Sequence, residues 1–210
     1  MWQNASRLLK NPSGLALAGA VVWLGLLAPP LRNGLESSMT LHMLVQLPLL
    51  ALIGFLWGRA WTASPVQSGR GRALAAVQSF NAGGAAGLIA ASFTMLLWML
   101  PRSLDAARLD LMVDALKFLT VPIAFGAAVA LSWPRCPAIA RAVIHLEAIA
   151  TLLRFGWGYL ATEQRLCLVY LLDDQQRAGE LLLWLGAAWA LAVVWRPMFG
   201  SLPQPHAARH

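Results

Sequence analysis

Charged residues are scarce in this chain. Only 12% of its 210 residues are Asp, Glu, Lys or Arg, whereas 59% are hydrophobic and the mean hydropathy is +0.61. A soluble globule needs far more polar surface than this to cover its core. The composition therefore excludes a soluble domain and predicts an integral membrane protein.

Cysteine is nearly absent as well. The two cysteines, Cys136 and Cys167, fall on opposite sides of the membrane in the topology predicted below. They cannot pair with each other there, and no C-x-x-C metal spacing occurs. These facts exclude a disulfide framework and a cysteine-ligated zinc site.

The signatures of common catalytic sites are also missing. The chain has no G-x-x-x-x-G-K-[ST] loop for phosphates, no H-E-x-x-H metalloprotease pair and no G-x-S-x-G nucleophile turn. We therefore expect that the protein is not an enzyme. Internal repeats and low-complexity tracts are absent from the sequence too, so residues 1–210 are expected to form a single integral membrane domain.

Apolar runs long enough to cross a bilayer make up most of the sequence. A transmembrane helix needs about 17 to 25 such residues, and six candidates occur, at 15–30, 40–58, 73–100, 111–133, 138–161 and 177–195. The predicted fold class is all-α, a polytopic transmembrane bundle of about six helices. Because the third run exceeds one crossing, we expect its first turns, near Gln78 and Asn81, to lie at an interface, or the helix to tilt.

Basic residues alternate from one connection to the next. The net charge of +7 would suit a nucleic-acid partner, but no single segment concentrates it. Lys and Arg are in excess before the first run, between the second and third, between the fourth and fifth, and after the sixth, whereas the other connections are balanced or slightly acidic. The positive-inside rule then predicts that both termini are cytoplasmic. No nucleic-acid partner is expected.

Soft, metal-capable side chains open the second apolar run. Helical spacing brings Met39 beside His42 and Met43, and an imidazole with thioethers is a plausible copper(I) site. Met95 and Met99 fall in the same outer third of the membrane. These five residues are the candidate metal ligands, although methionine at helical spacing is more often a packing residue.

Polar residues inside the predicted spans form a possible second layer. Ionisable groups in a membrane usually face the bundle interior or a water-filled cavity. The layer contains Gln46, Asp114, Lys117, Arg154 and Glu180. The layer supports the copper site, or its charges form ion pairs that hold the helices in register, and the two roles are not exclusive.

Three blocks of sequence resemble the CtaG family of cytochrome c oxidase assembly factors. His42-Met43-Leu44-Val45-Gln46 resembles that family's His-Met-x-x-His, and Trp98-Met99-Leu100-Pro101 its Trp-His-x-Pro. The block Asp173-Asp174-Gln175-Gln176, followed by Gly179, resembles its acidic-Asp-Gln-Gln-x-x-Gly. Gln46 and Met99 replace two of the family's histidines. The resemblance implies a divergent family member with a periplasm-facing copper site.

The expected function is therefore assembly or metallation of a respiratory haem-copper oxidase or related cuproprotein, with copper(I) as cofactor. The expected location is a bacterial inner membrane. The partners would be membrane lipid and a cytochrome oxidase subunit or another membrane redox complex.

Two alternatives stay open. One is a metal-free scaffold subunit that docks on a redox complex. The other is a small copper or solute transporter with His145, Glu147 and Arg154 along its path.

Overall fold

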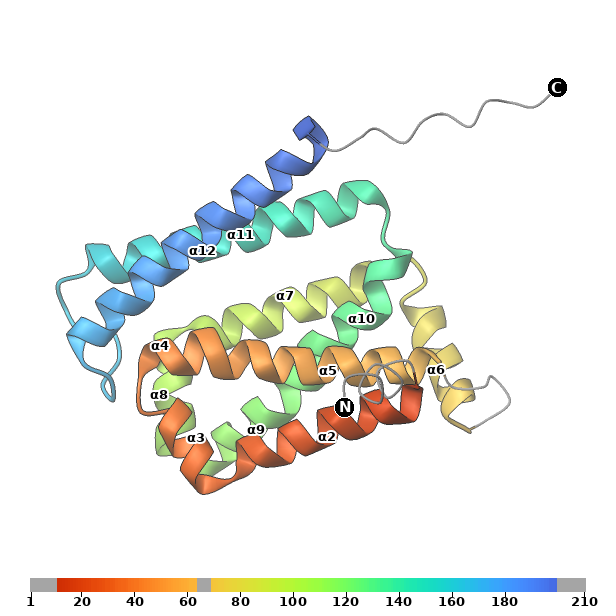
Figure 1. Cartoon of the computed structure of the whole chain (residues 1–210), viewed down its shortest axis with the longest axis horizontal. Coiled ribbons are helices and arrows are strands. Elements are labelled where there is room, and N and C mark those ends of the chain that lie inside the picture. The colour runs from red at the N-terminus through yellow and green to blue at the C-terminus, as the bar shows by residue number, and fades with distance from the viewer. Residues whose placement is uncertain (1–10, 64–68, 200–210) are drawn as a thin grey trace, which may run out of the picture.

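The computed structural model describes residues 11–63 and 69–199, and the described residues form helices and no strand. Figure 1 shows long helices running in roughly the same direction, with shorter ones at both ends. The helices of the first half are α2 (Pro12–Leu27), α3 (Pro29–Leu35), α4 (Met39–Leu41), the π-helix η1 (His42–Gln46), α5 (Leu47–Thr62), α6 (Gly69–Phe80) and α7 (Ala85–Met99). Those of the second half are α8 (Pro101–Leu109), α9 (Leu111–Thr120), the π-helix η2 (Val121–Ala127), α10 (Ala128–Ser132), the 3₁₀ turn η3 (Trp133–Arg135), α11 (Ala138–Ala161) and α12 (Leu172–Phe199).

The all-helical prediction is confirmed, and three helices are long and apolar enough to cross a membrane. They are Met39–Thr62, Leu111–Arg135 and Leu172–Trp195, and the number rises to five if two bent helix pairs each count as one span. The predicted run 138–161 coincides with α11, which is not among them and carries three charged side chains, Arg141, Glu147 and Arg154. The chain termini lie outside the described residues.

The predicted run 73–100 is not one helix. It bends by 85° between Arg72–Phe80 and Ala85–Met99. Gly84 adopts a left-handed conformation at φ +73°, which glycine tolerates best. The Asn81 side chain holds the bend, because it donates to Ser132 Oγ at 2.7 Å and accepts from the Gly87 N–H at 3.1 Å. The run is longer than one membrane crossing because it contains two helices joined by a sharp bend. The bend turns α6 away from the bundle (Figure 1).

Two π-helical segments shape the core, and a proline accompanies each. Pro122 in η2 has no N–H to donate to Phe118 O four residues earlier. That carbonyl accepts instead from the Trp23 indole of α2 at 3.0 Å. In η1 the Leu47 N–H reaches His42 O five residues back, directly before Pro48. Each widened turn thus lies next to a proline, which cannot donate the regular α-helical hydrogen bond.

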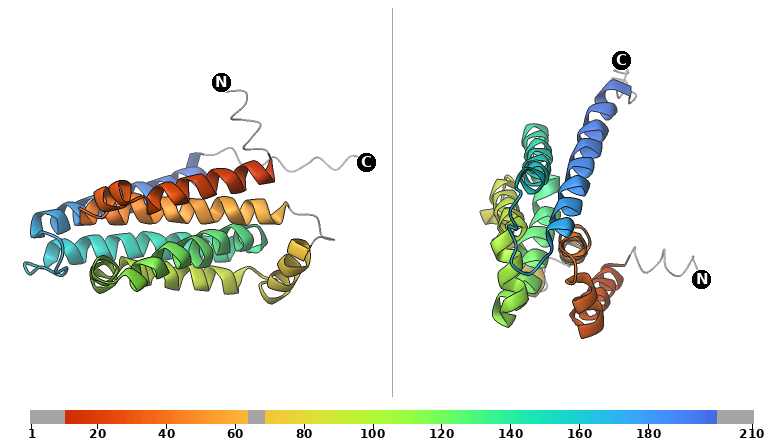
Figure 2. Two further views of the ribbon diagram at one scale, coloured as in Figure 1. Left: turned by 90° about the horizontal axis from the view of Figure 1, so that it is seen from below. Right: turned by 90° about the vertical axis from the view of Figure 1, so that its left-hand side faces the viewer.

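Small residues allow α5 and η2 to pack with their backbones close together. A Cβ built at Gly54 would overlap Pro122 O, and one at Gly126 would overlap Ala51 O. Small residues at such crossings are typical of membrane helices. On its other side α5 contacts α2, and the two run side by side in Figures 1 and 2.

The last two helices form an antiparallel hairpin that packs mainly on itself. Gly156 of α11 and Gly179 of α12 face each other, so that a Cβ on either would meet the other's carbonyl oxygen at about 3 Å. The hairpin touches the remaining helices mainly through α4 and α7. Figure 1 shows it along one side of the bundle.

Substituting Gly54 tests the α5–η2 contact. We expect Gly54→Ala to lower the free energy of unfolding in detergent by about 1–3 kcal/mol, because the methyl group must displace the Pro122 backbone. The control is Gly158→Ala in α11, where a Cβ meets nothing within 4 Å. It should leave stability unchanged or raise it slightly, since alanine favours helix. Equal behaviour of the two variants would contradict the close contact.

Candidate functional site

The η1 π-helix presents His42 and Gln46 to one buried cluster. Both side chains are fully buried, as is Lys117 of α9, which lies between them and the loop after α3. Fully buried lysine is rare unless it is paired. The three residues therefore mark a polar centre inside the bundle.

The Lys117 ammonium uses all its protons within this cluster. Its Nζ donates to Glu36 Oε1 at 2.7 Å, to His42 Nε2 at 2.9 Å and to Gln46 Oε1 at 3.1 Å. An ammonium has three hydrogens, so none remains. Asp114 Oδ1 also lies 2.7 Å from Nζ, and it is a buried oxygen that receives no hydrogen bond. Four acceptors thus surround one cation.

Two arginines complete the cluster from its rim. Arg108 of α8 donates to Glu36 Oε2 at 3.1 Å, and Arg32 of α3 pairs with Asp114. Both arginine side chains remain partly exposed, whereas the two carboxylates are almost fully buried. The cluster contains three cations and two anions, so that it carries a net positive charge.

Glu36 lies outside the candidate spans, between α3 and α4. Burial alone would raise the pKa of its carboxyl, but the hydrogen bond and the charge of Lys117, with a further hydrogen bond from Gln46, lower that pKa to about 2. Its ordinary value is 4.5. The Glu36 carboxylate is therefore held in its charged form.

Both ring nitrogens of His42 are occupied. Because an ammonium can only donate, Nε2 accepts from Lys117. The neutral ring then carries its hydrogen on Nδ1, which lies 2.7 Å from the Tyr170 hydroxyl oxygen and donates to it. No lone pair of His42 is left for a metal ion while Lys117 is in place.

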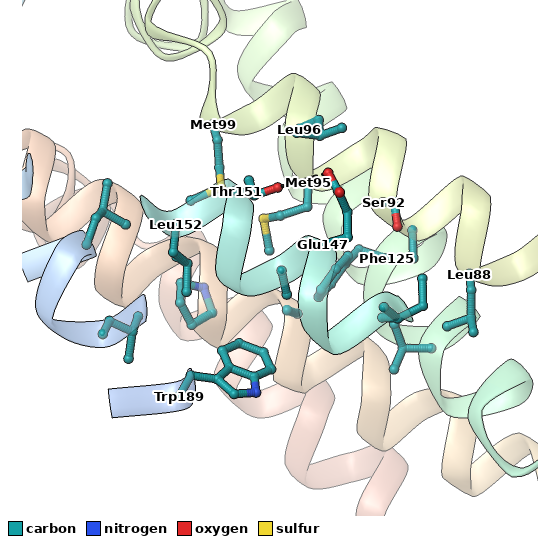
Figure 3. Close-up of a pocket in the computed structure, with 18 of the residues that line it drawn as sticks. Leu88, Ser92, Met95, Leu96, Met99, Phe125, Glu147, Thr151, Leu152 and Trp189 are labelled. Atoms are coloured by element: carbon teal, nitrogen blue, oxygen red, sulfur yellow. Dashed lines mark hydrogen bonds between the residues drawn. The ribbon is translucent and has the colours of Figure 1, made fainter. Parts of the chain in front are cut away.

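The methionines separate from His42 and gather elsewhere. Met43 of η1 with Met95 and Met99 of α7 line one cavity of about 460 Å³. Figure 3 shows Met95 and Met99 there, opposite Glu147 and Thr151 of α11. Met39 is buried in the same hydrophobic cluster as Met43 and Met99 but does not line the cavity.

Tyr159 of α11 anchors this group of methionines. Its hydroxyl lies 2.9 Å from Met99 O and 3.8 Å from Met43 Sδ. The hydroxyl has one hydrogen, and the shorter contact to the carbonyl takes it. The Met43 thioether therefore keeps its lone pairs.

Only part of the predicted polar layer comes together. Gln46, Asp114 and Lys117 are in the buried cluster, whereas Glu180 is exposed and Arg154 faces outward, 3.7 Å from Glu147. His145 contacts Trp133 and accepts from the Trp189 indole at 3.3 Å. The three residues proposed for a transport path are thus not joined by a buried network among the described side chains.

The Asp-Asp-Gln-Gln block joins the hairpin to α4. Asp174 accepts from the Met39 N–H and the Ser38 hydroxyl, at the start of that helix. Gln175, almost fully buried, donates to Tyr159 O at 3.2 Å and accepts from the Leu166 N–H at 2.9 Å. Asp173 and Gln176 are less buried, and Gly179 gives α12 its close contact with α11. The described contacts of this block are with protein groups.

Sequence reasoning missed Glu36, Arg32, Arg108 and Tyr170 as members of the cluster. Each lies in a connection or a short helix outside the predicted spans, so intramembrane depth did not select it. One signal was available, because a buried lysine needs a counter-ion and acceptors for all three of its hydrogens. Among the described residues, no group of three or more His, Cys, Asp or Glu is arranged to hold a metal ion.

Replacing the central cation tests the cluster. We expect Lys117→Met to lower the free energy of unfolding by about 3–5 kcal/mol, because two buried carboxylates lose their ammonium. Arg102→Met on α8 is the control, since this substitution removes the same charge from an exposed side chain. The measurement is reversible unfolding in detergent, followed by circular dichroism. A loss no larger than that of the control would contradict the network.

Acid should weaken the fold through Glu36. A pKa of about 2 in the folded chain, below the ordinary 4.5, means that this carboxylate contributes stability above pH 4.5 and loses it as the pH falls towards 2. We expect the melting temperature of Glu36→Gln to depend less steeply on pH over that range than that of the native chain. Parallel pH curves would show that Glu36 is not held ionised.

The chain was also compared with known proteins. No family model, no curated protein and no solved structure matches it. Its function is therefore inferred from the residues and contacts themselves.

Proposed function

We propose that this protein is a membrane assembly or metallation factor that holds copper(I) with the thioethers of Met43, Met95 and Met99. The observation that carries the proposal is that these three side chains line a single cavity. Thioether sulfur is a soft ligand that selects copper(I) over copper(II) and zinc. His42 is not a ligand in this proposal, because Lys117 and Tyr170 occupy its nitrogens.

The cavity offers further groups suited to a soft monovalent cation. Glu147 lines it and supplies a negative charge. The aromatic rings of Trp133 and Trp189 are also in the lining, and aromatic faces attract cations. The remaining lining is mostly aliphatic, so it offers few groups that would bind water in competition with the metal.

In this proposal the protein crosses a bacterial inner membrane about six times, with α11 as one of the crossings and both termini in the cytoplasm. The end that holds α3, α8 and residues 162–171 then faces the periplasm, where the basic residues are fewest relative to acidic ones. The recipient is the copper site of a haem-copper oxidase or another cuproprotein, in keeping with the resemblance to the CtaG family.

A second candidate is a metal-free scaffold subunit that docks on a membrane redox complex. It is favoured by the packing of Met43 and Met99, which lie in a hydrophobic cluster with Leu152 and Leu182. Methionine fills irregular core gaps well without binding metal. In this candidate the cavity takes lipid or stays empty, and the outer loops bind the partner.

Copper titration separates the two candidates. Detergent-purified native chain is titrated with copper(I) under reducing conditions, against a chromophoric copper(I) chelator. We expect about one copper per chain, because one set of three sulfurs is present, and a dissociation constant raised by about tenfold or more in Met99→Leu and in Met95→Leu. Met99→Leu removes the sulfur but keeps an apolar side chain and the backbone carbonyl that Tyr159 binds.

Two methionines serve as matched controls. Met112→Leu alters a side chain that is 74% exposed, and Met39→Leu alters a buried one that does not line the cavity. Neither should change copper affinity. Copper no higher than a detergent blank would reject the first candidate and favour the scaffold, whose own test is co-purification of the metal-free chain with an oxidase subunit.

A further inference from the structure

The acceptors around Lys117 have the geometry of a cation-binding cage. Four atoms from four residues lie between 2.7 and 3.1 Å from Nζ. They are two carboxylate oxygens, one amide oxygen and one imidazole nitrogen, drawn from the loop after α3, from η1 and from α9. All four side chains are at least 98% buried. Such a set of acceptors suits the N–H groups of an ammonium ion.

The cage is held by contacts that do not involve Lys117. Gln46 Nε2 donates to Glu36 Oε1 at 2.9 Å, and the Tyr170 hydroxyl holds the His42 ring. Arg32 pairs with Asp114 and Arg108 with Glu36, which orient the two carboxylates from outside. The acceptors therefore have reasons to stay in position when the lysine side chain is shortened.

We infer that the Lys117 ammonium is the tethered occupant of a cation site formed by Glu36, His42, Gln46 and Asp114. The site accepts a free primary ammonium ion when the tether is cut. In the native chain the four-carbon side chain of Lys117 places its own ammonium in the site. No ion from solution is needed to fill it. This inference is independent of copper binding at the methionines.

The Lys117→Ala variant opens the site, and n-propylammonium is the matching probe. Alanine retains Cβ, so the atoms removed are three methylene carbons and the ammonium, which are those of n-propylammonium. We expect Lys117→Ala to melt well below the native chain in detergent. Added n-propylammonium chloride should raise its melting temperature in a saturable way, as a ligand that binds only the folded state does.

Three comparisons make the result specific. Lys117→Met fills most of the same space with an apolar chain that is one atom shorter, so n-propylammonium should not stabilise it. Tetramethylammonium carries the same charge but has no N–H group, so it should not stabilise Lys117→Ala. Gln46→Leu added to Lys117→Ala removes one acceptor, and it should weaken n-propylammonium binding by about tenfold or more, the usual effect of one hydrogen bond to a charged group.

Rescue of Lys117→Ala by n-propylammonium alone would support the site. If tetramethylammonium stabilised Lys117→Ala equally, or if n-propylammonium stabilised Lys117→Met equally, the effect would be one of ionic strength. Either result would overturn the inference. No saturable response would overturn it as well.

If Lys117→Ala does not fold, the same series is run on Lys117→Ala with Glu36→Gln, which removes one charge of each sign and keeps three of the four acceptors. Copper is absent throughout, so failure here says nothing about the methionine cavity.

Discussion

The fold depends on the placement of one buried ammonium. Removing an ammonium from water costs several kcal/mol, and only close, well-oriented partners offset this. Lys117 has them on three separate chain segments, with Glu36 on the loop after α3, His42 and Gln46 on η1, and Asp114 one turn earlier on its own helix. The entry of the second apolar run, the loop before it and the fourth run are thereby held in one arrangement. Further along the same helices, Gly54 and Gly126 allow the close α5–η2 packing.

The cluster also explains why the histidine and the methionines of one short segment have different environments. His42 and Met43 are adjacent in η1, yet His42 faces Lys117 and Met43 faces the cavity bordered by α7 and α11. The η1 segment thus has a buried network of charges and hydrogen bonds on one side and an apolar cavity with thioether groups on the other. The two parts share only the backbone that carries them.

Much of the helical architecture followed from residue patterns, because the length of an apolar run reflects the thickness that a membrane helix must cross. The positions of Lys117, Asp114 and Gln46 in a polar interior were likewise predictable from the cost of burying them in a membrane. The break near Asn81 was not, since it depends on a side-chain bond to Ser132, 51 residues away. The same holds for the environment of His42. Helical spacing predicts which residues share a face with it, but not that Lys117, on another helix, would take its lone pair.

The carbonyl freed by Pro122 has a consequence for how the protein is made. Phe118 O is satisfied by the indole of Trp23, which is synthesised 95 residues earlier. Glu36 and His42 likewise precede Lys117 by more than 70 residues. The first helices are therefore made before Trp23 and His42 can meet the partners that Leu111–Arg135 brings, and until then Glu36 has only Gln46 and Arg32 beside it. The buried cluster is in this sense completed late in synthesis, since Tyr170, the second partner of His42, follows even after Lys117.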